Sequence, residues 1–292
     1  MTRTTIKTQI RWLALYLTLC IAFLLRLGSG HPAVLWHYLT DNLRYLLVKR
    51  GILSGAAKSV SEIRAAFEAN AVQGQFQQIW FDKNIVPWSL TFARIFNRAD
   101  PVDVLEIGSW EGRSTLFLLT YFTKGHLTAV DTWAAHTEGY EYKATSDSLD
   151  IEARFDSNVA PCAARLTKRK GSSLNVLPQL LGEQQEFDVI YVDGSHFADD
   201  ILADGITAWR MLKQGGILIF DDFLASFYPR ARANPWWAIK LLLKYHTGEY
   251  NILSVNYQQI ILKKKITFTD HARAEVADVV ASQYDDRLAE TS

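Results

Sequence analysis

The chain has 292 residues, enough for one α/β domain of about 200–250 residues with additional segments. Its 31 Lys and Arg residues balance 31 Asp and Glu residues, and the lack of a basic excess predicts no nucleic-acid partner. The two cysteines, Cys20 and Cys162, exclude a disulfide framework and a thiolate zinc site. With 49% hydrophobic and 21% charged residues, the composition is that of a globular protein, which we expect to be intracellular.

The N-terminus carries an apolar segment that differs from the rest of the chain. Residues 12–25 would form a helix about 21 Å long, shorter than the ~30 Å hydrocarbon core of a bilayer. Cations precede this segment at Arg3, Lys7 and Arg11. Three membrane interpretations are open: a cleaved signal peptide with small residues at 28–30, a retained signal anchor, and a monotopic hairpin with the amphipathic residues 33–50. A fourth interpretation is a buried packing helix.

Cations lie at both ends of residues 1–50, which favours keeping both ends in the cytoplasm over export. We therefore expect a cytoplasmic protein in which residues 1–50 are a candidate anchor to the cytoplasmic face of the membrane. Residues 51–98 are expected to form a helical cap, with helices at 56–70 and 88–96. Residues 266–292 are expected to form a C-terminal helix or tail.

Between residues 99 and 265, short apolar runs alternate with helical segments, as is typical of a parallel sheet covered on both faces. Strands are expected at 102–107, 127–130, 165–168, 187–192 and 216–220. Helices are expected at 114–121, 147–159, 173–181 and 199–212. Two further runs, 250–255 and 258–262, predict an antiparallel hairpin. The predicted fold class is therefore α/β, with a doubly wound, mostly parallel sheet.

The strongest local motif spans residues 104–114, where a buried strand leads through a glycine-bearing turn into a helix. Ligands of such sheets bind beyond the carboxyl ends of the strands, and glycine lets the backbone approach them closely. Gly108 and Gly112 are four residues apart, which is not the spacing of a dinucleotide fingerprint. Glu106 stands ahead of the turn, where a carboxylate would repel a pyrophosphate and attract an ammonium group. The motif therefore predicts a cationic ligand.

These residues resemble the first motif of the class I S-adenosylmethionine-dependent methyltransferases, whose seven-stranded sheet also ends in an antiparallel hairpin. The resemblance makes residues 99–265 the S-adenosylmethionine-binding domain. It places Glu106 and Ser114 at the methionine end of the cofactor, Asp131 at the ribose hydroxyls, and Trp133 with the turn at 171–173 near the adenine. Taken alone, Asp131 has the alternative role of a helix N-cap. The cofactor-binding residues that the resemblance implies are Glu106, Gly108, Ser109, Gly112, Ser114, Asp131, Thr132, Trp133, Ser172 and Ser173.

A second group of polar residues follows the fourth and fifth predicted strands. Asp193 and His196 come after the fourth strand, and Asp221 and Asp222 come after the fifth. Because the carboxyl ends of adjacent parallel strands meet at one edge, three carboxylates are expected to converge there. Such a group needs a counter-charge, and oxygen-only ligands suit a hard divalent cation. The alternative is that the aspartates cap loops and that His196 faces solvent.

This second pattern resembles the metal-dependent O-methyltransferases, which include the catechol type and enzymes that methylate sugars of macrolide antibiotics. The resemblance implies magnesium bound by Asp193, Asp221 and Asp222, with His196 as the catalytic general base. Catechol-type members have Lys as the base and Asn as the last ligand, so His196 and Asp222 favour the sugar type.

The sequence therefore predicts an enzyme that transfers a methyl group from S-adenosylmethionine to a hydroxyl of a small-molecule acceptor, a sugar or a phenol, with magnesium assistance. The acceptor pocket is expected from residues 56–98 and 223–246. One alternative is an NAD(P)-dependent oxidoreductase on a Rossmann-like fold, which the glycine spacing and Glu106 disfavour. Another is a non-catalytic, membrane-tethered cofactor-binding protein.

Overall fold

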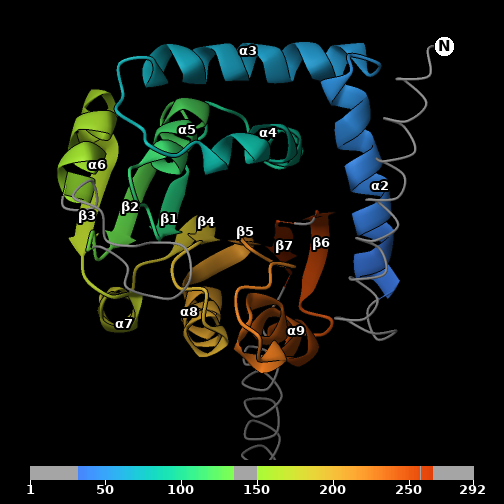
Figure 1. The fold of residues 1–292 in the computed structure, drawn as a ribbon, viewed down its shortest axis with the longest axis vertical. Helices are drawn as coiled ribbons and strands as arrows, with labels where there is room; N and C mark the ends of the chain where they lie inside the picture. Colours follow the sequence, from blue (N-terminus) through green and yellow to red (C-terminus); the bar gives the residue numbers. More distant parts are fainter. Residues whose placement is uncertain (1–31, 135–149, 257, 266–292) are drawn as a thin grey trace, which may run out of the picture.

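The computed structural model describes residues 32–134, 150–256 and 258–265 around a seven-stranded sheet (Figure 1). The strand order is β3-β2-β1-β4-β5-β7-β6. The strands are β1 Asp103–Ile107, β2 His126–Asp131, β3 Leu166–Lys170, β4 Phe187–Val192, β5 Leu212–Phe220, β6 Tyr250–Val255 and β7 Ile260–Lys264. Strands β1 to β5 pair in parallel, whereas β7 is antiparallel to β5 and β6. The predicted doubly wound, mostly parallel α/β sheet with an antiparallel C-terminal hairpin is confirmed.

Helices cover both faces of this sheet. The helices are α2 Pro32–Lys49, α3 Ser54–Ala71, α4 Ile85–Phe92, α5 Arg113–Tyr121, α6 Ile151–Val159, α7 Ser173–Gly182, α8 Ala198–Met211 and α9 Pro235–Tyr245. Helices α3 to α6 lie on one face and α7 to α9 on the other, while α2 lies beside β6 at the edge (Figure 1). Short 3₁₀ turns occupy Trp80–Asn84, Ala160–Arg165 and Ala231–Ala233.

Alternation along β1 determines where the first motif points. Leu105 and Ile107 belong to the core under α7 and α8, whereas Val104 belongs to the core under α3 to α6. Because successive residues of a strand face opposite sides of the sheet, Glu106 lies on the same side as Val104. Its side chain is fully buried there and is bonded to helix α5 through Thr115.

The helical cap belongs to the same core as the α5 face of the sheet. Phe67 of α3 makes edge-to-face contacts with Phe81 and Phe117, at ring-centroid distances of 6.1 and 5.5 Å. Trp88 of α4 meets the ring of Tyr191, on β4, at 4.8 Å and 88°. Such aromatic pairs stabilise a core beyond the area that they bury. The cap thereby covers the end of β4, next to the predicted site.

Several predicted boundaries differ from the structure, and three of these differences have a clear local reason. The helix predicted at 88–96 is Ile85–Phe92, because Pro87 fits within the first turn of a helix. The third strand begins at Leu166 because Arg165 ends a 3₁₀ turn and donates to the carbonyls of Phe122 and Gly125. The last strand is Ile260–Lys264 rather than 258–262, since the backbone N–H groups of Gln258 and Gln259 donate to Asn256 in the preceding turn.

The membrane prediction rests on residues that lie mostly outside the described ranges. Among the residues described, no helix has the length and apolar character that crossing a bilayer requires. The apolar segment 12–25 and the tail 266–292 are outside those ranges. The amphipathic stretch 33–50 corresponds to α2, which leaves Trp36, Leu43 and Leu46 exposed.

Candidate active site

Two glycines shape the turn that follows β1. Gly108 and Gly112 adopt φ values of +89° and +80°, in the left-handed region that favours glycine. A Cβ atom on Gly108 would lie 2.0 Å from the carbonyl oxygen of Asp193, and one on Gly112 would lie 2.7 Å from Val159. A side chain at Gly108 would push the turn away from the segment after β4, and one at Gly112 would push it away from α6. The turn therefore lies in contact with the segment that carries the predicted metal ligands.

Glu106 lies buried beneath this turn. The Thr115 hydroxyl donates to its carboxylate, and the pKa of Glu106 is raised to about 7. Burial is the main cause of the increase, and the nearby hydroxyls of Ser114, Thr115 and Ser109 oppose it. Ser109 and Ser114 are themselves buried. The first motif therefore brings one acid and three hydroxyls together at the start of α5.

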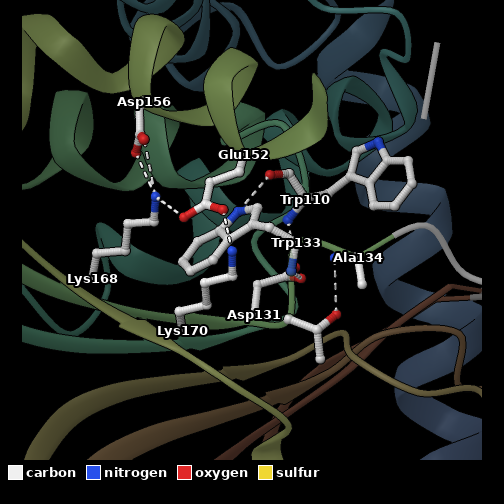
Figure 2. Close-up of polar contacts among 9 residues, drawn as sticks. Trp110, Asp131, Trp133, Ala134, Glu152, Asp156, Lys168 and Lys170 are labelled. Carbon is white, nitrogen blue, oxygen red and sulfur yellow. Dashed lines mark hydrogen bonds and ion pairs between the residues drawn. The ribbon is translucent and has the colours of Figure 1, made fainter. Parts of the chain in front are cut away.

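Asp131 ends β2 beside the same turn, and Figure 2 shows its two backbone partners. Its Oδ2 atom accepts the backbone N–H of Trp110 at 2.8 Å, and Oδ1 accepts that of Trp133 at 2.6 Å. The backbone N–H of Gly171, in the turn after β3, donates to the Asp131 carbonyl at 2.9 Å. The turns after β1, β2 and β3 are thus joined through Asp131, the first two by its carboxylate and the third by its carbonyl. Each carboxylate oxygen has further acceptor capacity, as the two hydroxyls of a ribose require.

The Trp133 side chain belongs to the wall of this region. It is 5% exposed, its indole N–H donates to the Trp110 carbonyl at 3.0 Å, and its ring lies 4.8 Å from that of Phe155. Lys168 covers the ring at 4.6 Å and pairs with Glu152, which binds β3 to α6 (Figure 2). The remaining predicted cofactor residues border the same edge. Thr132 follows Asp131, Ser172 is the N-cap residue of α7, and Ser173 is its first residue.

The acidic cluster forms at the ends of β4 and β5. The Tyr191 hydroxyl lies 2.6 Å from Oδ2 of Asp193 and 2.6 Å from Oδ2 of Asp221. Burial, with repulsion from Asp221 and Asp222, raises the pKa of Asp193 well above its usual value. Burial and Asp222 also raise the pKa of Asp221, while the Lys83 ammonium opposes the increase. The two carboxylates therefore share one hydroxyl proton and have little positive charge nearby.

Asp222 faces a different partner. Its backbone adopts φ +52°, and its Oδ2 atom lies 3.1 Å from Nε2 of His196. Across the described ranges, no three His, Cys, Asp or Glu side chains form a group that could hold a metal ion. Asp193 and Asp221 both accept from Tyr191, whereas Asp222 faces His196 while its charge still raises the pKa of the other two carboxyls. The left-handed turn at Asp222 directs this residue to the histidine.

Three contributors to the site were absent from the sequence prediction: Tyr191, Lys83 and Phe227. Tyr191 carried a usable signal, since residues two apart on a strand point to the same face and Asp193 follows it by two. No sequence signal points to Phe227 or Lys83, because both lie on segments distant from Asp193 and His196. The Phe227 ring stacks on His196, and Lys83 belongs to the cap.

Residues 105–223 match a family profile described as "Methyltransferase domain". The O-methyltransferase hkm8 of Aspergillus hancockii is 28% identical over 159 residues, covering 53% of this chain and 54% of that protein. This match, the O-methyltransferase relative and the seven-stranded topology agree with the class I methyltransferase family that the sequence resembles. These matches favour that interpretation over a nicotinamide-dependent oxidoreductase.

Solved structures similar to this chain include the MycE methyltransferase from the mycinamycin biosynthetic pathway, in complex with Mg, SAH and mycinamycin VI. It is 17% identical with a TM-score of 0.49, and the match covers 71% of this chain and 54% of that chain. The O-methyltransferase from Bacillus cereus, in complex with SAH, is 19% identical with a TM-score of 0.46, covering 71% and 91%. This chain spans about half the length of hkm8 and of MycE.

Replacing Asp131 tests the predicted cofactor site. Asp131→Ala should weaken S-adenosylhomocysteine binding by about 1–3 kcal/mol, because a buried acceptor for polar groups is lost. Titration calorimetry gives the affinity, and thermal unfolding checks that the variant is folded. Asp156→Ala, which removes an exposed carboxylate paired with Lys168, is the matched control and should bind like the wild type. Unchanged affinity in folded Asp131→Ala would remove this residue from the site.

The buried Glu106 predicts a specific pH dependence of stability. Its pKa rises from 4.5 to about 7 on folding, so the folded chain keeps a proton that the unfolded chain releases between these values. The free energy of unfolding should therefore fall, relative to Glu106→Gln, by up to about 1.4 kcal/mol per pH unit in this window. Urea titrations between pH 4 and pH 8 measure the difference. Parallel curves for both proteins would contradict the assignment.

Proposed function

We propose that this methyltransferase transfers a methyl group from S-adenosylmethionine to a hydroxyl of a small molecule, of the sugar or phenol class. The observation that carries the proposal is the contact between the turn after β1 and the acid–histidine cluster after β4 and β5. Gly108 lies against the carbonyl of Asp193, so a cofactor held by the turn and an acceptor held by the cluster would be neighbours. Such proximity is what an in-line displacement at a sulfonium carbon needs.

His196 and Asp222 supply the proton chemistry in this proposal. S-adenosylmethionine, as substrate, gives its methyl group to the acceptor oxygen and keeps the sulfur electron pair. The acceptor hydroxyl loses its proton to His196. Because Nε2 of His196 faces the Asp222 carboxylate at 3.1 Å, Nε2 is the donor and Nδ1 is the nitrogen that accepts the proton. Asp222 also stabilises the imidazolium that results.

Magnesium fits the donor chemistry of the neighbouring pair. Asp193 and Asp221 present carboxylate oxygens around a single hydroxyl, and repulsion between them raises the pKa of Asp193. Hard oxygen donors with excess negative charge suit this cation. Asp193 and Asp221 would hold it, while Asp222, the third ligand that the sequence predicts, faces His196 in this structure. A bound magnesium ion would stabilise the acceptor oxygen as an alkoxide or phenolate.

We also propose that residues 1–50 associate with the cytoplasmic face of a membrane. Trp36 and Leu43 of α2 are 67% and 56% exposed, and the helix ends in the exposed cations Lys49 and Arg50. Exposed apolar side chains beside cations are typical of helices that lie in the headgroup region of anionic bilayers. The apolar segment 12–25 adjoins this helix along the chain and would add to the buried area.

Removing the metal and removing the base should have different effects. EDTA should abolish methyl transfer to an acceptor found by a labelled-methyl screen, while S-adenosylhomocysteine binding stays intact. Asp221→Asn should have the same effect, because it removes a charge that the cation requires. His196→Ala should retain binding of Mn²⁺, measured by titration, and lose about 10²–10⁴-fold in rate.

Asp199→Asn, at an exposed position of α8, is the control for these variants. Full activity in EDTA would refute the magnesium assignment and leave His196 as a base acting without it. An unchanged rate in His196→Ala would refute the base. Binding of S-adenosylhomocysteine without turnover on any acceptor would instead support a non-catalytic cofactor-binding protein.

Vesicle flotation tests the membrane proposal on the full chain. The protein should float with vesicles that contain anionic lipid, and Trp36→Ser with Leu43→Ser should reduce the bound fraction because apolar contact is lost. Val72→Ser, a change at an equally exposed apolar position of the cap, is the control. Wild-type protein that stays entirely in the unbound fraction would contradict the proposal.

A further inference from the structure

We propose that the segment between β5 and α9 positions the base: Phe227 holds the His196 imidazole by ring stacking, and Asn234 fixes Phe227 in place. The inference rests on the proposed function, in which His196 accepts the acceptor's proton. In this assignment Phe227 and Asn234 are positioning residues, because they act through His196.

Two consecutive ring stacks join this segment to the loop after β4. The rings of His196 and Phe227 lie 4.1 Å apart and within 10° of parallel. The rings of Phe197 and Tyr228 lie 4.6 Å apart and within 7° of parallel. Neighbouring residues of one loop thus stack on neighbouring residues of the other. A sliding motion of either loop would break both stacks, so the pair fixes the position of one loop against the other.

Asn234 gives the segment its shape. This side chain is 2% exposed, and its Oδ1 atom accepts the backbone N–H groups of Phe227 at 2.7 Å and Tyr228 at 2.9 Å. Its Nδ2 atom donates to the carbonyls of Tyr228 at 2.9 Å and Arg230 at 3.0 Å. One buried amide therefore satisfies the backbone of both aromatic residues. Replacing it would remove the partner of several backbone groups in this segment.

The two stacked loops are also supported by packed helices. Phe197 directly precedes α8, and Asn234 directly precedes α9. The side chains of α8 and α9 belong to one core cluster, which includes Ile201, Ala208, Ile239 and Leu242. The stacked rings consequently stand at the ends of two helices that are fixed relative to each other.

His196 needs this support because little else restrains its ring. The side chain is 43% exposed, and Asp222 contacts only the Nε2 edge. A hydrogen bond at one nitrogen still permits the ring to rotate about that contact. Phe227 on one face removes this freedom and leaves the other face and Nδ1 to the acceptor. General-base catalysis depends on such placement, to within about 0.5 Å and 10–20°.

The first test measures the stack without using activity. In histidine-labelled protein, the ring current of Phe227 should shift the His196 ring protons upfield, with the signals assigned through His196→Gln. Phe227→Leu should remove this shift, and Phe227→Tyr should retain it. Tyr245→Leu, an exposed aromatic position of α9, is the control. An unchanged His196 spectrum in Phe227→Leu would overturn the proposal.

The second test separates positioning from direct contact with the acceptor. Phe227→Leu should lower kcat by about 10- to 100-fold with little change in the acceptor KM or in S-adenosylhomocysteine affinity, and Phe227→Tyr should restore kcat. In the His196→Ala background, Phe227→Leu should have no further effect, because the positioned group is absent. A raised acceptor KM, or a full additional loss in that background, would show that Phe227 lines the acceptor pocket and would overturn the proposal. A wild-type rate in His196→Ala would instead refute the base itself, whatever the spectrum shows.

Discussion

The site depends on hydrogen bonding that continues past the ends of the parallel strands. The backbone N–H of Gly108 donates to Val130, that of Asp193 to Ile107, and that of Asp221 to Val192, at 2.8, 2.8 and 3.0 Å. Each residue after a strand is therefore held by the neighbouring strand. Because β2, β1, β4 and β5 are adjacent and parallel, the four strand ends form one edge. The placement of Gly108 against the Asp193 carbonyl follows from this register.

This arrangement puts carboxylates where they are difficult to ionise. Glu106, Asp193 and Asp221 all have raised pKa values, and burial is the main cause in each. The backbone of the parallel sheet fixes the position of each of these side chains, regardless of its charge. Tyr191 offers only one proton to two of them. Holding these carboxylates at this edge therefore costs electrostatic free energy. In the proposed function, a cationic substrate and a metal cation bound there would reduce that cost.

Much of the fold followed from residue patterns, and so did the meeting of the candidate site residues at one edge of the sheet. Continuous apolar runs predicted the parallel strands, and Gly108 and Gly112 predicted the turn, since both features depend on local sequence. The predicted cofactor-site and acidic residues come to one edge because strand ends are fixed by the topology. The direction of Asp222 was not predictable, because it depends on a left-handed turn at a residue that is not glycine. The contacts of Phe227 and Lys83 join segments that are distant along the chain, so residue spacing in the sequence does not predict them.

The difference between the two aspartates after β5 shows how a short segment can serve two purposes. Asp221 continues the strand geometry, and its side chain accepts the same Tyr191 hydroxyl that Asp193 accepts. Asp222 departs from that geometry at φ +52° and meets His196 instead. The segment that begins at Asp222 returns to the site at Phe227, whose ring stacks on the His196 imidazole. A single change of backbone direction after β5 therefore supplies both groups that restrain His196, and it leaves Asp193 and Asp221 as the adjoining oxygen pair.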